Sequence, residues 1–147
     1  MNIPFKLKSR AFRVLSFLPP SVLYFAQRNI TRRSRVRIDE IQRGWHFHAE
    51  SIQNSGACRL IEFGAGKTLA QNLYLSQFVD EQTVVDLFPM LELPMLNQAV
   101  QQLHALGVPL DTREITSLSM LKDVHNILYL APYDMTITNF PDECFDI

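Results

Sequence analysis

The fold is decided by the stretch Cys58-Arg59-Leu60-Ile61-Glu62-Phe63-Gly64-Ala65-Gly66-Lys67-Thr68. Its first six residues, 58–63, predict a buried β-strand that ends at Gly64. Two alternating glycines, Gly64 and Gly66, then allow a sharp turn and leave no Cβ in the way of a bound molecule. Residues 68–77 have helical apolar spacing, and the first N–H groups of such a helix would face the turn. The stretch therefore predicts a strand, a tight loop and a helix that together face a ligand.

The alternation of strand and helix patterns continues to the end of the chain. Residues 83–87 are rich in β-branched side chains and predict a second strand. Residues 91–106 carry an apolar stripe at helical spacing, followed by Gly107 as a C-cap. The series is completed by a short helix over residues 115–124, a third strand over residues 127–131 and the start of a fourth strand at residues 144–147. These units predict an α/β fold with a Rossmann-like parallel sheet, incomplete at about three to four strands and preceded by N-terminal helices.

The first 55 residues differ from the rest in composition. Apolar spacing predicts a helix that ends at Pro19-Pro20, a second helix over residues 22–30 and a third over residues 38–53. Residues 1–44 contain ten Lys and Arg but only two acidic residues, a net charge of +8 that leaves −9 for the rest of the chain. We therefore divide the chain into a basic helical cap region, residues 1–55, and an α/β domain, residues 56–147. The arginine cluster at residues 32–37 has two interpretations: a solvated cap on the acidic domain, or a contact for an anionic substrate or a membrane surface.

The composition excludes several classes of protein. A chain of 147 residues with 47% hydrophobic and 20% charged residues fits one folded domain rather than a disordered protein. Arg13 interrupts the apolar run near the N-terminus, and no stretch reaches the roughly 20 apolar residues of a transmembrane helix. Cys58 and Cys144 have the spacing of neither a disulfide framework nor a metal site, which predicts a cytoplasmic protein without bound metal. Because no aromatic residues stand among the arginines, we do not expect nucleic acid as a partner.

Three classes of ligand bind glycine-rich turns at the end of a strand. A nucleoside triphosphate would suit Gly66-Lys67-Thr68, but its motif needs a first glycine at Ile61, inside the strand. A dinucleotide motif would need its third glycine at Leu69. Glu62 separates a third class from these two, because a carboxylate directly before the turn repels phosphate groups and attracts a cationic ligand.

The turn resembles motif I of class I, Rossmann-like S-adenosylmethionine-dependent methyltransferases. This motif is roughly [DE]-x-G-x-G-x-G, and Thr68 stands in place of its third glycine. The resemblance implies that Gly64, Ala65 and Gly66 surround S-adenosylmethionine. It also implies that Glu62 attracts the cationic amino-acid end of that molecule.

Two further acids stand where similar enzymes place ligand-binding carboxylates. Asp86 follows the second strand, where a carboxylate can accept from two ribose hydroxyls, with Leu87 beside it. The alternative for Asp86 is the N-cap of the following helix. Asp134 follows the third strand, where the resemblance implies a bond with the adenine amino group and apolar contact from Tyr133 and Met135. The alternative for Asp134 is an ordinary turn aspartate.

The segment Pro141-Asp142-Glu143-Cys144-Phe145-Asp146 also resembles the stretch that leads into the fourth strand of these enzymes. We therefore expect the chain to supply the S-adenosylmethionine-binding half of a methyltransferase for a small-molecule acceptor. A complete domain of this family has more strands, so we expect the chain alone to be unstable or inactive. Two alternatives stay open, a non-catalytic nucleotide-binding module and an inactive truncation product. We assign no catalytic residue, because the four histidines equally fit surface or packing positions.

Overall fold

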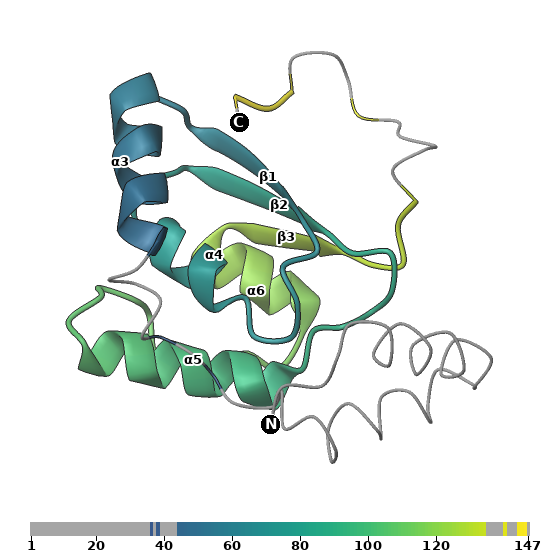
Figure 1. Cartoon of the computed structure of the whole chain (residues 1–147). Coiled ribbons are helices and arrows are strands. Elements are labelled where there is room, and N and C mark those ends of the chain that lie inside the picture. Colours follow the sequence, from purple (N-terminus) through teal and green to yellow (C-terminus); the bar gives the residue numbers. More distant parts are fainter. Residues whose placement is uncertain (1–35, 37, 39–43, 135–139, 141–143, 147) are drawn as a thin grey trace, which may run out of the picture. The chain divides into compact units, whose positions relative to one another are not determined.

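The computed structural model describes residues 36, 38, 44–134, 140 and 144–146 (Figure 1). These residues belong to Val36–Ile147, one of the two compact units into which the chain divides. The helices expected before residue 36 and all four arginines of the cluster, Arg32, Arg33, Arg35 and Arg37, lie outside the described residues. Met135 and Ile147 also lie outside them.

Three parallel strands form the sheet: β1 (Arg59–Phe63), β2 (Glu81–Val85) and β3 (Ile127–Leu130), in the order β1-β2-β3. Phe63 on β1 is opposite Val85 on β2, and Val85 is opposite Leu130 on β3. The three strands therefore end together at one edge of the sheet. This arrangement, with helices beside it, confirms the predicted α/β fold with a parallel sheet.

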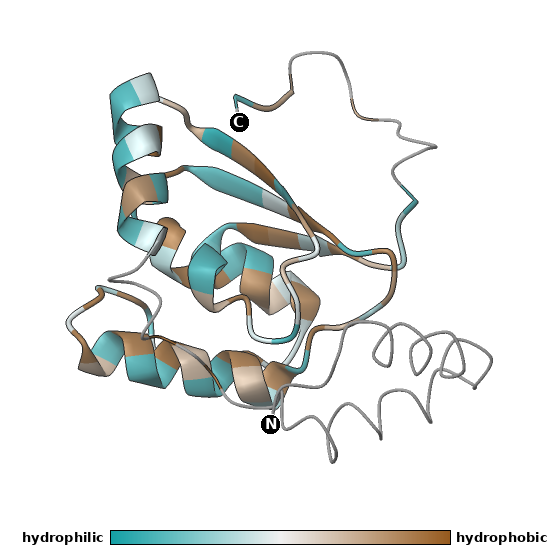
Figure 2. Ribbon diagram, viewed as in Figure 1, coloured by the Kyte–Doolittle hydropathy of each residue, from teal (hydrophilic) through white to brown (hydrophobic). Residues whose placement is uncertain are grey.

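Four helices accompany the sheet in the described part of the chain: α3 (His46–Ser55), α4 (Ala70–Leu75), α5 (Leu93–Ala105) and α6 (Leu118–His125). The two connections, from β1 to β2 and from β2 to β3, step across the sheet in the same direction. Because such connections are right-handed, both carry their helices onto the same face. One apolar core on that face accordingly joins Leu73 of α4, Leu103 of α5 and Leu121 of α6 with Val84 and Tyr129 of the sheet. Apolar residues, brown in Figure 2, occupy most of β3 and alternate with polar residues along α5.

A second, smaller core attaches α3 to the sheet. Ala49 and Ile52 of α3 pack with Leu60 of β1 and Leu75 of α4. Trp45, directly before α3, also lies 6.0 Å from Tyr74 of α4, measured between ring centroids. The helix before β1 thus belongs to the same compact unit as the sheet, and the boundary between the two units falls before Val36.

Several helices begin later than the sequence pattern predicts, and for two of them the local backbone shows why. The helix expected from Thr68 begins at Ala70, because Leu69 has a left-handed backbone (φ 48°) that no α-helix contains. The helix expected from Ile115 begins at Leu118, after Ser117, whose Oγ accepts from the backbone N–H of Met120. In both cases the apolar pattern predicts a helix that begins before the residue at which the backbone becomes helical.

The segment expected to start a fourth strand lies beside β1 but is not a strand over Cys144, Phe145 and Asp146. The backbone N–H of Asp146 donates to the carbonyl of Arg59 at 2.9 Å. Its Oδ2 accepts from the backbone N–H groups of Cys58 and Arg59, and its Oδ1 accepts from the Arg59 guanidinium at 3.0 Å. The backbone N–H of Gly64 points toward β2. Because the backbone N–H and carbonyl groups of successive residues point to alternate sides of a strand, those of Arg59 point to the opposite, outer edge of β1. The chain therefore returns to the side of β1 away from β2.

None of the helices in the described part of the chain combines the length and the apolar character that crossing a bilayer requires.

Candidate functional site

The turn after β1 lies against the end of β2. Gly64 (φ 74°) and Gly66 (φ 78°) both have left-handed backbones, which favour glycine. The N–H of Gly64 donates to the carbonyl of Val85 at 2.9 Å, and a Cβ on Gly64 would lie 4.0 Å from Oδ1 of Asp86. The glycine-rich turn and the acid after β2 are therefore neighbours.

Asp86 is buried at the end of β2, with 3% of its surface exposed. The hydroxyl of Tyr129 donates to its Oδ2 at 2.8 Å and accepts from the N–H groups of Met90 and Leu91. Burial, together with the bond to Asp86, raises the pKa of Tyr129 to about 12. Asp86 is not a helix N-cap, because α5 begins at Leu93 with Glu92 before it.

The turn after β3 is bonded to the same carboxyl end of β2. The N–H of Tyr133 donates to the carbonyl of Asp86 at 3.0 Å. Asp134, the next residue, is exposed, and Tyr133 is half-buried with its ring stacked on Phe140 at 5.6 Å. Asp86 and Asp134 thus follow adjacent strands and belong to connected turns.

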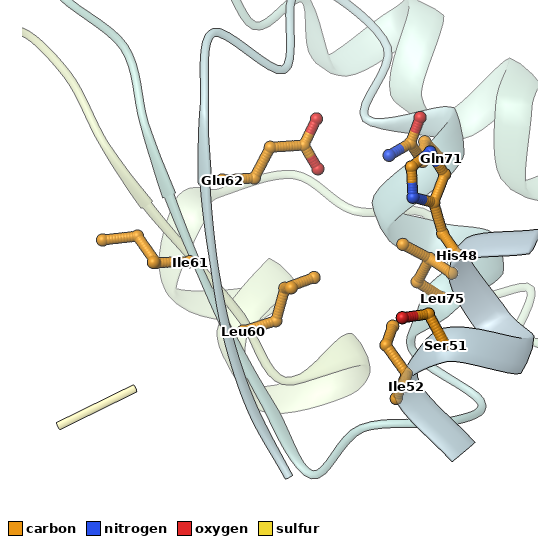
Figure 3. A pocket seen from close by; sticks show the side chains of 8 residues that line it. All are labelled: His48, Ser51, Ile52, Leu60, Ile61, Glu62, Gln71 and Leu75. Atoms are coloured by element: carbon orange, nitrogen blue, oxygen red, sulfur yellow. The ribbon is translucent and has the colours of Figure 1, made fainter. Parts of the chain in front are cut away.

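Glu62 points from β1 toward α3 and α4 (Figure 3). Its Oε2 accepts from the side-chain amide of Asn72 at 2.8 Å, and the Asn72 amide also donates to Gln82 at 3.3 Å. Burial raises the pKa of Glu62, and the charge of Asp86 raises it further, whereas the bond from Asn72 and the nearby His48 act in the opposite direction. Glu62 is therefore held by Asn72 in a largely enclosed environment that disfavours its ionised form.

A cavity of about 230 Å³ opens beside Glu62 (Figure 3). Its walls come from α3, β1 and α4. The lining residues are His48, Ser51, Ile52, Leu60, Ile61, Glu62, Gln71 and Leu75.

Lys67, which would be the phosphate-binding lysine of a nucleoside triphosphate site, already has a carboxylate partner. Its Nζ lies 2.7 Å from Oε1 of Glu92, and its carbonyl accepts from the N–H of Glu92 at 3.0 Å. Only 9% of the Lys67 side chain is exposed. A phosphate group would have to displace Glu92, so the arrangement disfavours this ligand class.

Large apolar side chains are exposed where the strands end. Phe63 is the last residue of β1, and Leu87 and Phe88 follow β2, each with 57–59% of its surface exposed. Leu87 was predicted from the sequence as a site residue, but the two phenylalanines were not. The signal for these was available, because an apolar residue at a strand end beside a glycine turn has no neighbouring element to cover it.

The side chains that hold the acids in place were missed because each of them lies on a different helix or strand from the acid that it contacts. Tyr129 is 43 residues from Asp86, and Asn72 is in the helix that follows Glu62. Within the described residues, no group of three or more His, Cys, Asp or Glu side chains is arranged to hold a metal ion.

The turn of Gly64, Ala65 and Gly66 lies beside Asp86, which Leu87 follows, and Tyr133 and Asp134 come after the next strand. Glu62 is on the helix side of β1, and Met135 lies outside the described residues. Comparisons with models of protein families, with curated proteins and with solved structures each found no match to this chain.

Proposed function

We propose that this chain binds S-adenosylmethionine at the carboxyl ends of β1, β2 and β3, as the cofactor-binding half of a methyltransferase for a small-molecule acceptor. One observation carries the proposal. Acids accompany three neighbouring parallel strand ends, Glu62 on β1, Asp86 after β2 and Asp134 after β3, around a turn with two left-handed glycines.

The strand order supports a ligand at this edge. β2 and β3 lie to one side of β1, and Asp146 bonds to the other side. Successive segments of the chain are therefore added first on one side of β1 and later on the other. In open parallel sheets, ligands bind beyond the strand ends at the point where the side changes. The turn of Gly64 to Gly66 begins at this point.

Each acid is suited to a different part of the ligand. Oδ2 of Asp86 is held by Tyr129 and its Oδ1 lies beside Gly64, so the carboxylate is fixed in position to accept from the ribose hydroxyls. Asp134 is exposed and can accept from the adenine amino group. Glu62 attracts the cationic amino-acid end, and Leu87 and Tyr133 offer apolar contact to the base.

When bound, S-adenosylmethionine would supply a methyl group carried on a sulfonium: a nucleophile of the acceptor would form a bond to the methyl carbon as the carbon–sulfur bond breaks and its electron pair stays on the sulfur. The described residues contribute by positioning the donor. Because the two cysteines are free, we also place the protein in the cytoplasm.

Titration calorimetry of the full chain with S-adenosylmethionine, S-adenosylhomocysteine and ATP tests the proposal. We expect the first two to bind and ATP not to bind. Asp86→Asn should weaken binding by at least about tenfold, because hydrogen bonds to a charged acceptor contribute about 1.5–3 kcal/mol. Asp111→Asn is the control, since Asp111 is exposed and pairs with Arg113.

Binding of ATP without S-adenosylmethionine, or equal affinities of the Asp86→Asn variant and the wild type, would contradict the proposal. A melting curve for each variant separates loss of binding from loss of folding.

A further inference from the structure

Of the residues proposed to bind S-adenosylmethionine at the strand-end edge, the cavity beside Glu62 shares Glu62 alone. Its walls include neither the glycines of the turn nor Asp86, Tyr133 or Asp134. Its volume of about 230 Å³ exceeds that of engineered cavities of ~150 Å³ that bind benzene. It therefore has room for a compact organic molecule with a ring or a short chain.

The cavity wall has an apolar part and a polar part. Ile52, Leu60 and Leu75 are buried members of the smaller core and form the apolar part. Glu62 and Gln71 belong to the polar part, and Figure 3 shows their polar groups in the gap between β1 and α4. A ligand matched to this cavity has an apolar body and one polar head.

Glu62 determines which polar head group a ligand of this cavity would carry. Asn72 is fully buried and its side-chain amide donates to Oε2 of Glu62, while the side-chain amide of Gln82 on β2 donates to the backbone carbonyl of Asn72 at 2.9 Å. No lysine or arginine among the described residues forms an ion pair with Glu62. Burial and the charge of Asp86 both raise its pKa, so the ionised carboxylate would be stabilised by a cation.

We propose that this cavity is a second binding site, for small primary amines with an apolar or aromatic tail. The ammonium group donates to Glu62, and the tail packs on Ile52, Leu60 and Leu75. Ser51 lies at the exposed rim on α3. The site stands whether or not the chain binds S-adenosylmethionine, because it needs neither the glycine turn nor Asp86.

The test uses the isotope-labelled full chain and three probes of one size: benzylammonium, benzyl alcohol and phenylacetate. Amide shifts are followed by NMR at mildly alkaline pH, where an imidazole is ordinarily uncharged. We expect benzylammonium to shift the amides of Ser51, Leu60 and Gln71 with a millimolar Kd, which is typical of so small a ligand. The neutral alcohol should bind about tenfold more weakly and the anion not at all.

Two variants locate the probe. Glu62→Gln keeps an oxygen for Asn72 but removes the charge, and it should make the amine and the alcohol bind alike. Ser51→Trp should block the cavity mouth, whereas Gln53→Trp, an exposed position on the same helix outside the cavity, should leave binding intact.

Equal binding of the three probes by the wild type, or unchanged amine binding in Ser51→Trp, would overturn the proposal. Competition at the shared Glu62 is expected, but shifts of the Ser51 and Gln71 amides on addition of S-adenosylhomocysteine alone would also overturn it, since the cavity would then be one end of the strand-end site. Asp86→Asn should retain the amine, so failure of one site is distinguishable from failure of the other.

Discussion

The hydroxyl of Tyr129 joins three parts of the fold at the residue scale. It donates to Asp86 after β2 and accepts from Met90 and Leu91 in the segment before α5. Because its pKa is raised to about 12, the hydroxyl remains a donor throughout the neutral range. The position of the Asp86 carboxylate is therefore set by a residue on the next strand and not by its own turn.

His125 should make the fold sensitive to acid. The residue is 5% exposed, and its Nε2 has no partner among the described residues. Burial lowers its pKa below the ordinary 6.5, more than nearby Asp111 raises it. As the pH falls below 6.5, the unfolded chain gains a proton that the folded chain does not bind, so the free energy of unfolding decreases, by at most about 1.4 kcal/mol per pH unit.

Urea unfolding of the wild type and His125→Gln between neutral pH and about pH 5 measures this contribution. We expect the variant to lose less stability on acidification than the wild type. His104→Gln, at an exposed histidine of α5, should behave as the wild type does. Parallel pH profiles for the wild type and His125→Gln would contradict the prediction.

At the scale of elements, the strands were easier to predict than the helix starts. Each strand combines a short apolar run with a following turn residue, and each observed strand lies within two residues of its expected bounds. A helix was expected from Ile115, but the backbone N–H and carbonyl of Ile115 bond to the side chain of Asn97 on α5. This contact between segments delays α6 together with the Ser117 cap, and only the cap is a local feature of the sequence.

The pair of Lys67 and Glu92 connects the glycine turn with the start of α5. Replacement of Lys67 by Met should reduce the free energy of unfolding by about 1–2 kcal/mol, because Glu92 would keep its charge while losing a largely buried partner. The helix N-terminus still favours that carboxylate, which limits the loss. Urea unfolding measures the change.

Arg113→Met is the matched control, because it removes a cation from an exposed ion pair with Asp111. We expect no measurable change from it. An equally harmless Lys67→Met would contradict the prediction that this ion pair stabilises the fold. If the variant also weakened binding of S-adenosylhomocysteine tenfold, Lys67 would belong to the ligand site and not to the scaffold.

At the scale of the whole molecule, the strand order could be expected only in part. Strand–helix–strand patterns predict parallel pairing, and consecutive strands commonly pair. The return of the chain to the outer edge of β1 depends on Asp146 and Arg59, which are 87 residues apart. The three acids were selected from their positions at strand ends, Glu62 near the end of the first strand and Asp86 and Asp134 after the next two. The partners of Asp86 and Glu62, Tyr129 and Asn72, depend on packing between elements.

Asp146 should protect the start of β1. Its Oδ2 accepts from the N–H groups of Cys58 and Arg59, and the bond from the Arg59 side chain contributes most to lowering its pKa to about 2. Asp146→Ala should therefore speed hydrogen exchange at these two amides, while exchange at Thr83 in β2 stays slow. In the wild type the protection should hold above the ordinary carboxyl pKa of 3.8 and be lost as the pH falls toward 2.

Unchanged exchange at Cys58 and Arg59 in Asp146→Ala would show that the segment does not hold the outer edge of β1. Asp111→Ala serves as the comparison, since its Oδ1 accepts only from the local N–H of Arg113. That variant should alter exchange at Arg113 alone.

Leu69 has a consequence for anyone who redesigns this protein. Its left-handed backbone costs a non-glycine residue about 1–2 kcal/mol, and a torsion-angle criterion would recommend glycine. However, its side chain is completely buried in the main core, and burial of a leucine contributes about 1.5–3 kcal/mol. The loss of packing, enlarged by the cavity left behind, would exceed the relief of torsional strain. Leu69 should therefore be kept, although its torsion angles alone would favour glycine.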